Sequence, residues 1–280
     1  MYIATGRFFI DEAIASYRSL RQFMPTLPVC IFTDDTEYAG RVFDTVIKIE
    51  NPFRNFLEKI PPLEESPFER TMFVDTDTIF AGDMRDVFDL MDRFDIAAAP
   101  DPFWVVAPTC PPCFQHLNTG LIVYRKTDQV TAFFRQWFSE FEAELKRAPD
   151  NPENWHDQVH FQRLLYHSPL RLYVLPVEYN LRVQFPQVLR VWAPAKLMHS
   201  HDMSPLPALG ERLNNALDYR VVFPNWTLLH RTTFHMVSAW NEKVLTSAKR
   251  MLDMLVGSGI WVLRQARGLG GGKHTSKSKH

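Results

Sequence analysis

The sequence predicts an α/β fold built on a mainly parallel, doubly wound sheet. Short continuous apolar runs alternate with helix-like segments through the first 100 residues. Such runs are typical of strands that are buried on both faces, as in parallel sheets covered by helices. Two carboxylates, Asp75 and Asp77, directly follow one of these runs. Ligands of open α/β sheets bind outside the carboxyl ends of strands, so a functional site is expected there.

One helix and five strands are expected in the first third of the chain. Apolar residues recur at helical spacing from Ile10 to Met24, and Pro25 ends this helix. The expected strands cover residues 2–4, 29–32, 42–49, 71–74 and 95–99. Asp75 therefore follows the fourth strand.

The second half has a less regular pattern. Helices are expected over residues 127–147, with an aromatic face that is typical of core, and over 157–166. Short strands are expected at 121–124, 172–175 and 196–198. Proline-punctuated loops fill 100–118 and 176–210, and loops of that length are usually functional.

The C-terminal region is predicted to lie outside the catalytic domain. We expect a catalytic domain over 1–225, a helical extension over 226–268 and a disordered basic tail over 269–280. The apolar face of the helix from Trp240 has two alternative partners. Packing on the catalytic domain or on a second subunit, as in a homodimer, is favoured. The alternative is peripheral contact with an anionic membrane, since Trp261 lies beside the basic tail.

Charge and composition exclude several classes of protein. Residues 264–280 carry five basic and no acidic residues, which leaves 26 basic against 32 acidic residues in 1–263. An acidic body argues against a nucleic-acid binder. Three cysteines are too few for a disulfide scaffold. There is no signal-peptide pattern and no uncharged apolar run of about 18 residues, so a cytoplasmic protein is expected.

The acidic pair has three interpretations. Two buried carboxylates are costly without a counter-charge, and a hard cation such as Mg²⁺ or Mn²⁺ removes that cost and bridges to a diphosphate. Asp75 and Asp77 therefore fit a nucleotide-sugar glycosyltransferase. They also fit a haloacid-dehalogenase-type phosphatase, but such an enzyme carries the pair on its first strand. The third interpretation is a pair of ordinary strand-end turn residues.

Several separated segments match one known family pattern in the right order. The matching positions are residues 2–5, Phe9, 17–21, Arg70, 75–78, 97–102, 117–124, 156–158, 175–180 and 196–199. Each segment alone is a weak signal, but their order and spacing over residues 1–200 are specific. Together they resemble the retaining GT-A-fold glycosyltransferases around glycogenin and galactinol synthase.

The resemblance implies a metal-dependent enzyme that moves a sugar from a UDP-sugar donor to a glycan or other hydroxyl acceptor, with retention. Asp75, Asp77 and His199 would bind Mn²⁺ or Mg²⁺. Asp157 and Gln158 are the implied catalytic residues beside the reacting carbon of the sugar. The implied donor-binding residues are Ala4, Thr5 and Phe9 around the base, and Arg70, Thr76, Asp101, Asn118 and Gly120 around the rest of the donor.

The chain also departs from the family pattern. The family's histidine is followed by Gly and Lys-Pro-Trp, whereas Ser200, His201 and Asp202 follow it here. His201 is therefore an alternative ligand to His199, since residues two apart on a strand share a face. Lys196 and Arg212 are two candidate replacements for the missing lysine. The same loss keeps open a third class of function, an inactive glycosyltransferase-like binding module.

A second cluster has the spacing of metal ligands but is interpreted as a loop. Cys110, Cys113 and His116 lie in a proline-rich segment, and no second Cys-x-x-Cys supplies a complete zinc site. We therefore expect a loop with two free or locally bridged thiols.

Overall fold

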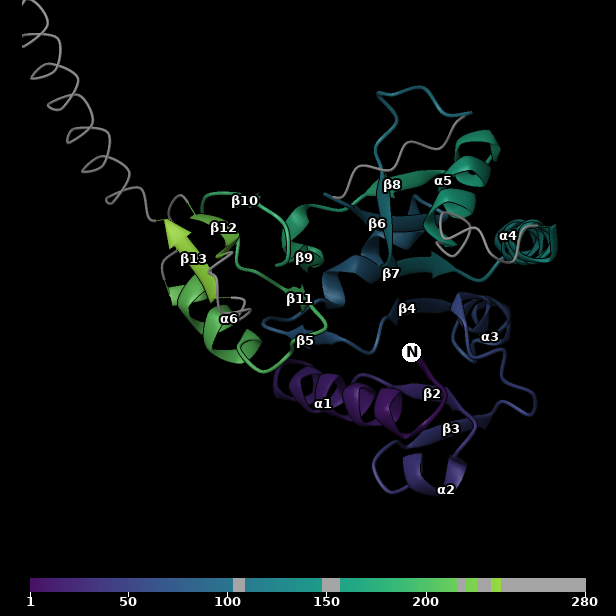
Figure 1. The fold of residues 1–280 in the computed structure, drawn as a ribbon, viewed down its shortest axis with the longest axis horizontal. Coiled ribbons are helices and arrows are strands. Elements are labelled where there is room, and N and C mark those ends of the chain that lie inside the picture. The colour runs from purple at the N-terminus through teal and green to yellow at the C-terminus, as the bar shows by residue number, and fades with distance from the viewer. Residues whose placement is uncertain (103–108, 148–156, 216–219, 226–232, 238–280) are drawn as a thin grey trace, which may run out of the picture. The chain divides into compact units, whose positions relative to one another are not determined.

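Figure 1 shows the computed structural model, which describes residues 1–102, 109–147, 157–215, 220–225 and 233–237. The chain divides into two compact units, 1–236 and 237–280. The predicted helix from Trp240, the basic tail and the proposed membrane or subunit contact all fall outside the described residues. The predicted boundary at residue 225 stays a prediction.

The first sheet is parallel, as predicted. Its order is β1 (Tyr2–Ala4), β2 (Cys30–Thr33) and β3 (Thr45–Lys48). The helix α1 (Arg7–Phe23) leads from β1 to β2 and buries its apolar face against the core. The backbone N–H of Val74 donates to the Met1 carbonyl, which joins β1 to the strand before Asp75. The carboxyl ends of these strands therefore lie on the same side.

The second sheet is mixed rather than mainly parallel. Its order is β4 (Arg70–Val74), β7 (Leu117–Arg125), β6 (Ile96–Pro100) and β8 (Leu172–Val174). Strand β7 runs antiparallel to both β4 and β6, while β6 and β8 are parallel. Continuous apolar runs did not reveal this reversal, because a strand buried on both faces has the same pattern in either direction.

A small third sheet sets the position of the predicted histidine. Strand β11 (Leu197–His199) runs antiparallel to β5 (Thr78–Phe80) and parallel to β9 (Leu181–Arg182). The register pairs His199 with Thr78, the residue after Asp77. The Ser200 N–H also donates to the Asp77 carbonyl at 3.0 Å. His199, which lies 122 positions after Asp77 in the sequence, is thereby held beside the acidic pair.

Two predicted helices pack against the second sheet. Helix α4 (Asp128–Arg147) buries its aromatic face, and the Trp137 and Phe161 ring centroids lie 4.9 Å apart. The Trp137 indole N–H donates to the Asp157 carbonyl at 3.1 Å, which fixes the first residue of α5 (Asp157–His167). The aromatic face is therefore core, as expected, and it also positions a candidate catalytic residue.

The remaining described elements lie around these sheets (Figure 1). They are α2 (Thr36–Ala39), η1 (Phe56–Lys59), α3 (Ile60–Glu65), η2 (Arg85–Asp92), η4 (Val177–Tyr179), β10 (Gln187–Leu189), α6 (Leu206–Asn215), β12 (Arg220–Asn225) and β13 (Thr233–Val237). No helix among the described residues is both long and apolar enough to cross a membrane.

Candidate active site

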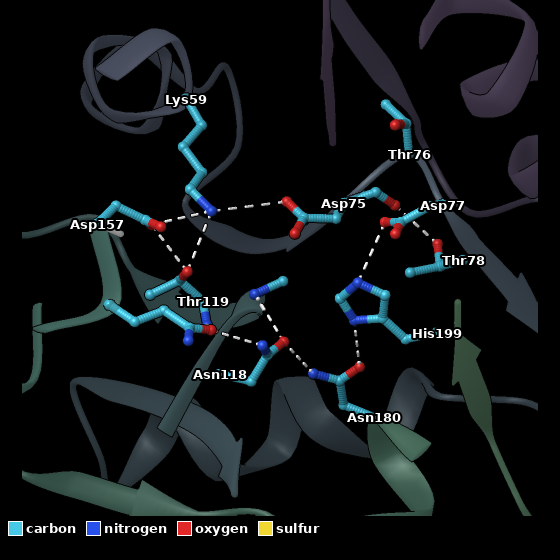
Figure 2. A network of polar contacts seen from close by, with 12 residues as sticks. Lys59, Asp75, Thr76, Asp77, Thr78, Asn118, Thr119, Asp157, Asn180 and His199 are labelled. Carbon is cyan, nitrogen blue, oxygen red and sulfur yellow. Dashed lines mark hydrogen bonds and ion pairs between the residues drawn. The ribbon is translucent and has the colours of Figure 1, made fainter. Parts of the chain in front are cut away.

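Polar side chains from distant parts of the sequence converge beside the acidic pair (Figure 2). Asp75 and Asp77 lie between β4 and β5, and His199 ends β11. Strand β7 contributes Asn118, Thr119 and Gly120, α5 contributes Asp157 and Gln158, and η1 contributes Lys59. Most of these positions were predicted, whereas Lys59 was not.

Asp75, Asp77 and His199 form what we call the metal group. Each offers a ligand atom, and these atoms all lie within 4.8 Å of one another. The His199 Nε2 is 3.1 Å from Asp77 Oδ1, and both side chains are buried. His201, the predicted alternative, places Nδ1 3.0 Å from Asp77 Oδ2, but its side chain is 90% exposed. His199 is therefore the histidine that shares a buried position with both carboxylates.

A chain of hydrogen bonds sets the tautomer of His199. The Gly120 N–H can only donate, so its 3.0 Å partner in Asn118 must be the amide oxygen. That oxygen also accepts from the Asn180 amide nitrogen at 2.7 Å, which turns the Asn180 oxygen toward His199 Nδ1 at 3.0 Å. Nδ1 therefore carries the ring proton and Nε2 presents its lone pair. Histidine ligands of metals are commonly oriented by such a partner.

The lone pair of Nε2 then faces a carboxylate oxygen, which is unfavourable unless a cation lies between them. Gly120 leaves the space for one. A Cβ at this position would lie 2.4 Å from His199 Cε1 and 2.8 Å from Asp75 Oδ2. Two carboxylates and one imidazole suit Mn²⁺ or Mg²⁺. The residues of the metal group therefore fit a divalent cation, in the cradle that Gly120 keeps open.

The two carboxylates of the metal group differ in electrostatics. Burial alone would raise the pKa of Asp77, but protonated imidazoles of His199 and His201 outweigh it and, with no cation bound, hold that pKa far below its usual range. Burial raises the pKa of Asp75, and Lys59 at 3.8 Å opposes the rise only in part. Asp75 is thus a half-buried carboxyl, its side chain 29% exposed, with incomplete compensation, as expected of a group that waits for a cation.

Lys59 and Asp157 form a buried ion pair next to the metal group (Figure 2). The Lys59 Nζ is 2.9 Å from Asp157 Oδ2 and donates to the Thr119 hydroxyl at 3.0 Å. That hydroxyl donates to Asp157 at 2.8 Å. Burial opposes the charge of Lys59, but Asp157 and Asp75 raise its pKa. In the sequence, only the position of Lys59 within the largely apolar segment 56–60 could have pointed to this residue.

The amides of Asn118 and Gln158 hold the buried carboxylate of Asp101. Asn118 donates to Asp101 Oδ2 at 3.1 Å and to the Gln158 amide oxygen at 2.6 Å. The Gln158 amide nitrogen donates to the same Asp101 oxygen at 3.0 Å. Arg182, which the sequence did not single out, lies 3.2 Å from that oxygen as well. Three of the residues predicted for the donor and catalytic positions thus share one polar network.

Arg70 does not join this group. It is the first residue of β4, and the strand separates it from Asp75 by roughly 16 Å at about 3.3 Å per residue. Its guanidinium donates instead to the Phe88 carbonyl and to Asp92. The sequence correctly places Arg70 five residues before Asp75. Because those five residues form strand β4, however, Arg70 and Asp75 lie at opposite ends of the strand.

The residues predicted around the base lie at the start of α1. Ala4 ends β1, Thr5 follows it, and the Phe9 side chain is 51% exposed. The ring of Phe9 is therefore accessible to a ligand. Thr76 points elsewhere, since its hydroxyl donates to Glu12 on α1 at 2.7 Å.

Cys110, Cys113 and His116 do not come together as a group of possible metal ligands among the described residues. Cys110 is buried and Cys113 is exposed, and both thiols are free. Neither ring nitrogen of the buried His116 has a hydrogen-bond partner in the part of the chain that the structure describes. The expected loop with two thiols agrees with this arrangement.

No protein-family model matches this chain, and no curated protein does. Solved structures match its fold. A structure of an active-site Gln-to-Glu variant of LgtC aligns with a TM-score of 0.51 at 10% identity, over 77% of this chain and 95% of that chain. The galactosyltransferase LgtC in complex with donor and acceptor sugar analogs aligns at 0.49 and 11% identity, with the same coverage. Mouse xyloside xylosyltransferase 1 in its apo form aligns at 0.48 and 13%, over 73% and 97%.

These alignments support the fold alone. The predicted α/β fold of the GT-A type is confirmed by the LgtC variant, which covers most of both chains. The finer resemblance to glycogenin and galactinol synthase stays a prediction. The chain has the GT-A fold.

Proposed function

We propose that this chain is a metal-dependent glycosyltransferase that moves a sugar from a UDP-sugar to a hydroxyl acceptor, such as a glycan, with retention. The observation that carries the proposal is one arrangement. The metal group lies beside the Lys59–Asp157 ion pair at the carboxyl end of β4, within a GT-A fold. This is the edge at which open α/β sheets bind ligands.

The metal group would hold Mn²⁺ or Mg²⁺ through Asp75, Asp77 and His199. A metal bound there supplies Lewis-acid stabilisation of the negative charge that develops on a departing diphosphate. Asn180 keeps the His199 lone pair directed at that position through the Nδ1 hydrogen bond. The protein's part is to present the three ligands in fixed orientation before the donor arrives.

Asp157 and Gln158 are proposed to act on the sugar. The reacting carbon of a glycosyl donor becomes oxocarbenium-like, and a nearby carboxylate or amide oxygen stabilises that charge. Lys59 and Thr119 hold the Asp157 side chain in a fixed orientation. The Gln158 amide oxygen is fixed by the Asn118 side chain and the Thr119 N–H.

The donor's base is proposed to stack on Phe9, near Ala4 and Thr5. An exposed aromatic ring in the first turn of α1 offers a face for a uracil. Asp101, Asn118 and Gly120 would line the sugar and diphosphate side. A closed site needs matched donors and acceptors for the hydroxyls of a sugar, and this network supplies both. A cytoplasmic location remains a prediction from the sequence.

The phosphatase interpretation is not favoured. It requires the acidic pair after the first strand, whereas Asp75 follows β4. The inactive binding module differs from the enzyme in one measurable respect, which is turnover of the bound donor.

Calorimetry with UDP tests the metal-dependent site. We expect binding in the presence of Mn²⁺ that is lost when EDTA is added. Melting-temperature shifts with a panel of UDP-sugars would then identify the donor, since a ligand that binds only the folded state stabilises it. Release of free sugar or UDP from that donor measures turnover.

The outcomes separate the hypotheses. Equal UDP affinity with and without metal would contradict the metal-dependent site. Binding of UDP-sugars without any hydrolysis or transfer, across a panel of glycan acceptors, would indicate the inactive module. Turnover of a phosphate monoester without UDP-sugar binding would restore the phosphatase.

A further inference from the structure

Arg182 is a buried cation at the edge of the candidate active site. Its side chain is 17% exposed, and its terminal nitrogen lies 3.2 Å from Asp101 Oδ2. The Asp101 side chain is 1% exposed. A guanidinium carries five N–H donors in a fixed fork. Among the described residues this guanidinium has Asp101 as its ion-pair partner, and its Nε is buried without any partner.

The strand register directs Arg182 toward the metal group. Arg182 ends β9, and its partner across the parallel pair is His199. Residues paired in register project their side chains to the same face of a sheet. The Arg182 guanidinium therefore shares a face with the imidazole of the metal group.

The surroundings are rich in negative charge. Five carboxylates surround this region of the site. Among the described residues, Lys59 and Arg182 are the Lys and Arg side chains that bond to the metal group or to the polar network beside it. The five are Glu12, Asp75, Asp77, Asp101 and Asp157. Lys59 is already engaged by Asp157 and Thr119. An anionic ligand entering this site therefore needs a further donor cation, and Arg182 is the described one with an unused buried donor.

We propose that Arg182 binds the diphosphate of the donor nucleotide. This inference rests on the proposed function. The guanidinium keeps its contact with Asp101 and directs its unused N–H groups to a phosphate oxygen beside the metal group. Arginine suits this task because its planar fork binds phosphate through two parallel hydrogen bonds.

The two lysine replacements named from the sequence are placed elsewhere. The Lys196 Nζ donates to the Asp83 carbonyl at 2.6 Å, away from the metal group. Arg212 lies exposed on α6. Neither has a described contact with the polar network, so both serve as matched controls.

The test compares UDP, UMP and uridine in calorimetry with Mn²⁺, for the full chain and for Arg182→Ala, Arg182→Lys, Lys196→Ala and Arg212→Ala. We expect Arg182→Ala to weaken UDP about 10- to 100-fold, the loss of a charged hydrogen bond. Uridine affinity should not change, and UMP should lose less than UDP. Arg182→Lys keeps a charge near Asp101, so it should fold even if the alanine variant does not, and it should still weaken UDP selectively. The two control variants should match the wild type.

Each contrary result has one meaning. Wild-type protein that binds no UDP at any metal concentration overturns the proposed function, and with it this inference. Metal-dependent UDP binding in the wild type, with unchanged UDP affinity in folded Arg182→Lys and Arg182→Ala, overturns the role of Arg182 alone. Equal losses for UDP and uridine also overturn it, because Arg182 would then support the site as a whole. A selective loss of UDP in Lys196→Ala or Arg212→Ala would assign the phosphate to that residue instead.

Discussion

The metal group and the Lys59–Asp157 pair are adjacent, yet they solve the problem of buried carboxylates differently. Asp157 has an internal counter-ion at 2.9 Å and a hydroxyl donor at 2.8 Å. Asp75 has only a share of the same lysine at 3.8 Å, and its pKa is raised by burial. The chain itself compensates Asp157, whereas it compensates Asp75 only in part, as the proposed cation site would require.

The difference separates two kinds of task. A group with a permanent partner is oriented before any ligand binds, which suits a residue that stabilises a transition state. A carboxylate without a permanent partner is suited to binding a cation, because the cation relieves the free-energy cost of burying the carboxylate. Four of the five changes that follow test whether the metal group controls binding and the ion pair controls turnover, and the fifth tests the proposed base site.

The largest effect is expected from Asp77→Asn. The neutral amide cannot hold a divalent cation beside His199, so Mn²⁺-dependent UDP binding should fall by about a thousandfold or more, the loss of one of three ligands. Calorimetry measures it, and circular dichroism should show the fold unchanged. Retained Mn²⁺-dependent affinity in a folded variant would mean that the metal group does not bind the metal.

Asp157→Ala should act on turnover rather than on UDP. We expect the turnover number to fall by about 100- to 1000-fold, while UDP affinity stays near the wild-type value, since the contact is made mainly in the transition state. The variant also leaves Lys59 buried without its partner, at a cost of about 3 to 5 kcal/mol in the free energy of unfolding.

Asp157→Asn separates the two roles of that residue. It should keep the Thr119 and Lys59 hydrogen bonds, and thus most of the stability, yet lose turnover. Urea denaturation and single-turnover kinetics on both variants measure this. Parallel losses of UDP affinity and rate would show that Asp157 is structural and that the two regions are not independent.

Asn180→Ala removes the side chain that orients His199. Its amide oxygen fixes the Nδ1 proton, so its loss should weaken Mn²⁺ affinity by about 10- to 100-fold, as for other residues behind metal ligands. Metal titration by calorimetry provides the measurement, without any need for turnover. Unchanged affinity would show that the tautomer of His199 is not controlled by Asn180.

The smallest effect is expected from Phe9→Ala. Stacking of a base on an aromatic ring contributes about 1 to 3 kcal/mol, so UDP and uridine should both bind about tenfold more weakly. Phe23 is 37% exposed at the other end of the same helix and provides the matched control, because Phe23→Ala should bind like the wild type. An equal loss in both variants would place the base elsewhere.

Patterns along the chain predicted those parts of the site that lie on or directly after buried strands. Asp75 and Asp77 follow β4, Asn118 lies within β7, and His199 ends β11, all close to the predicted positions. The error at Arg70 has the same origin as these successes. The two ends of a buried strand lie at opposite edges of the sheet. Only the residues after the carboxyl end of the strand reach the site.

Lys59 and Arg182 show what patterns could not predict. Lys59 lies in a largely apolar segment, where a charged residue is typical of the polar end of a helix. Arg182 lies in a proline-punctuated loop region. Their roles depend on which carboxylates face them, and Asp157 and Asp101 are 98 and 81 positions away. Partners at such separations are chosen by the packing of the sheets and leave no periodic signal.

The sequence by itself determined the α/β class, the order of strands up to Asp75, the two long helices and the composition of the metal group. These follow from local periodicity and from the rule that ligands bind at the carboxyl ends of strands. Only the tertiary structure decided the direction of β7, the choice of His199 over His201, the tautomer of that histidine and the cations that compensate Asp157 and Asp101. Each of these depends on which side chains meet across the sheets, and that is fixed by long-range packing rather than by neighbouring residues.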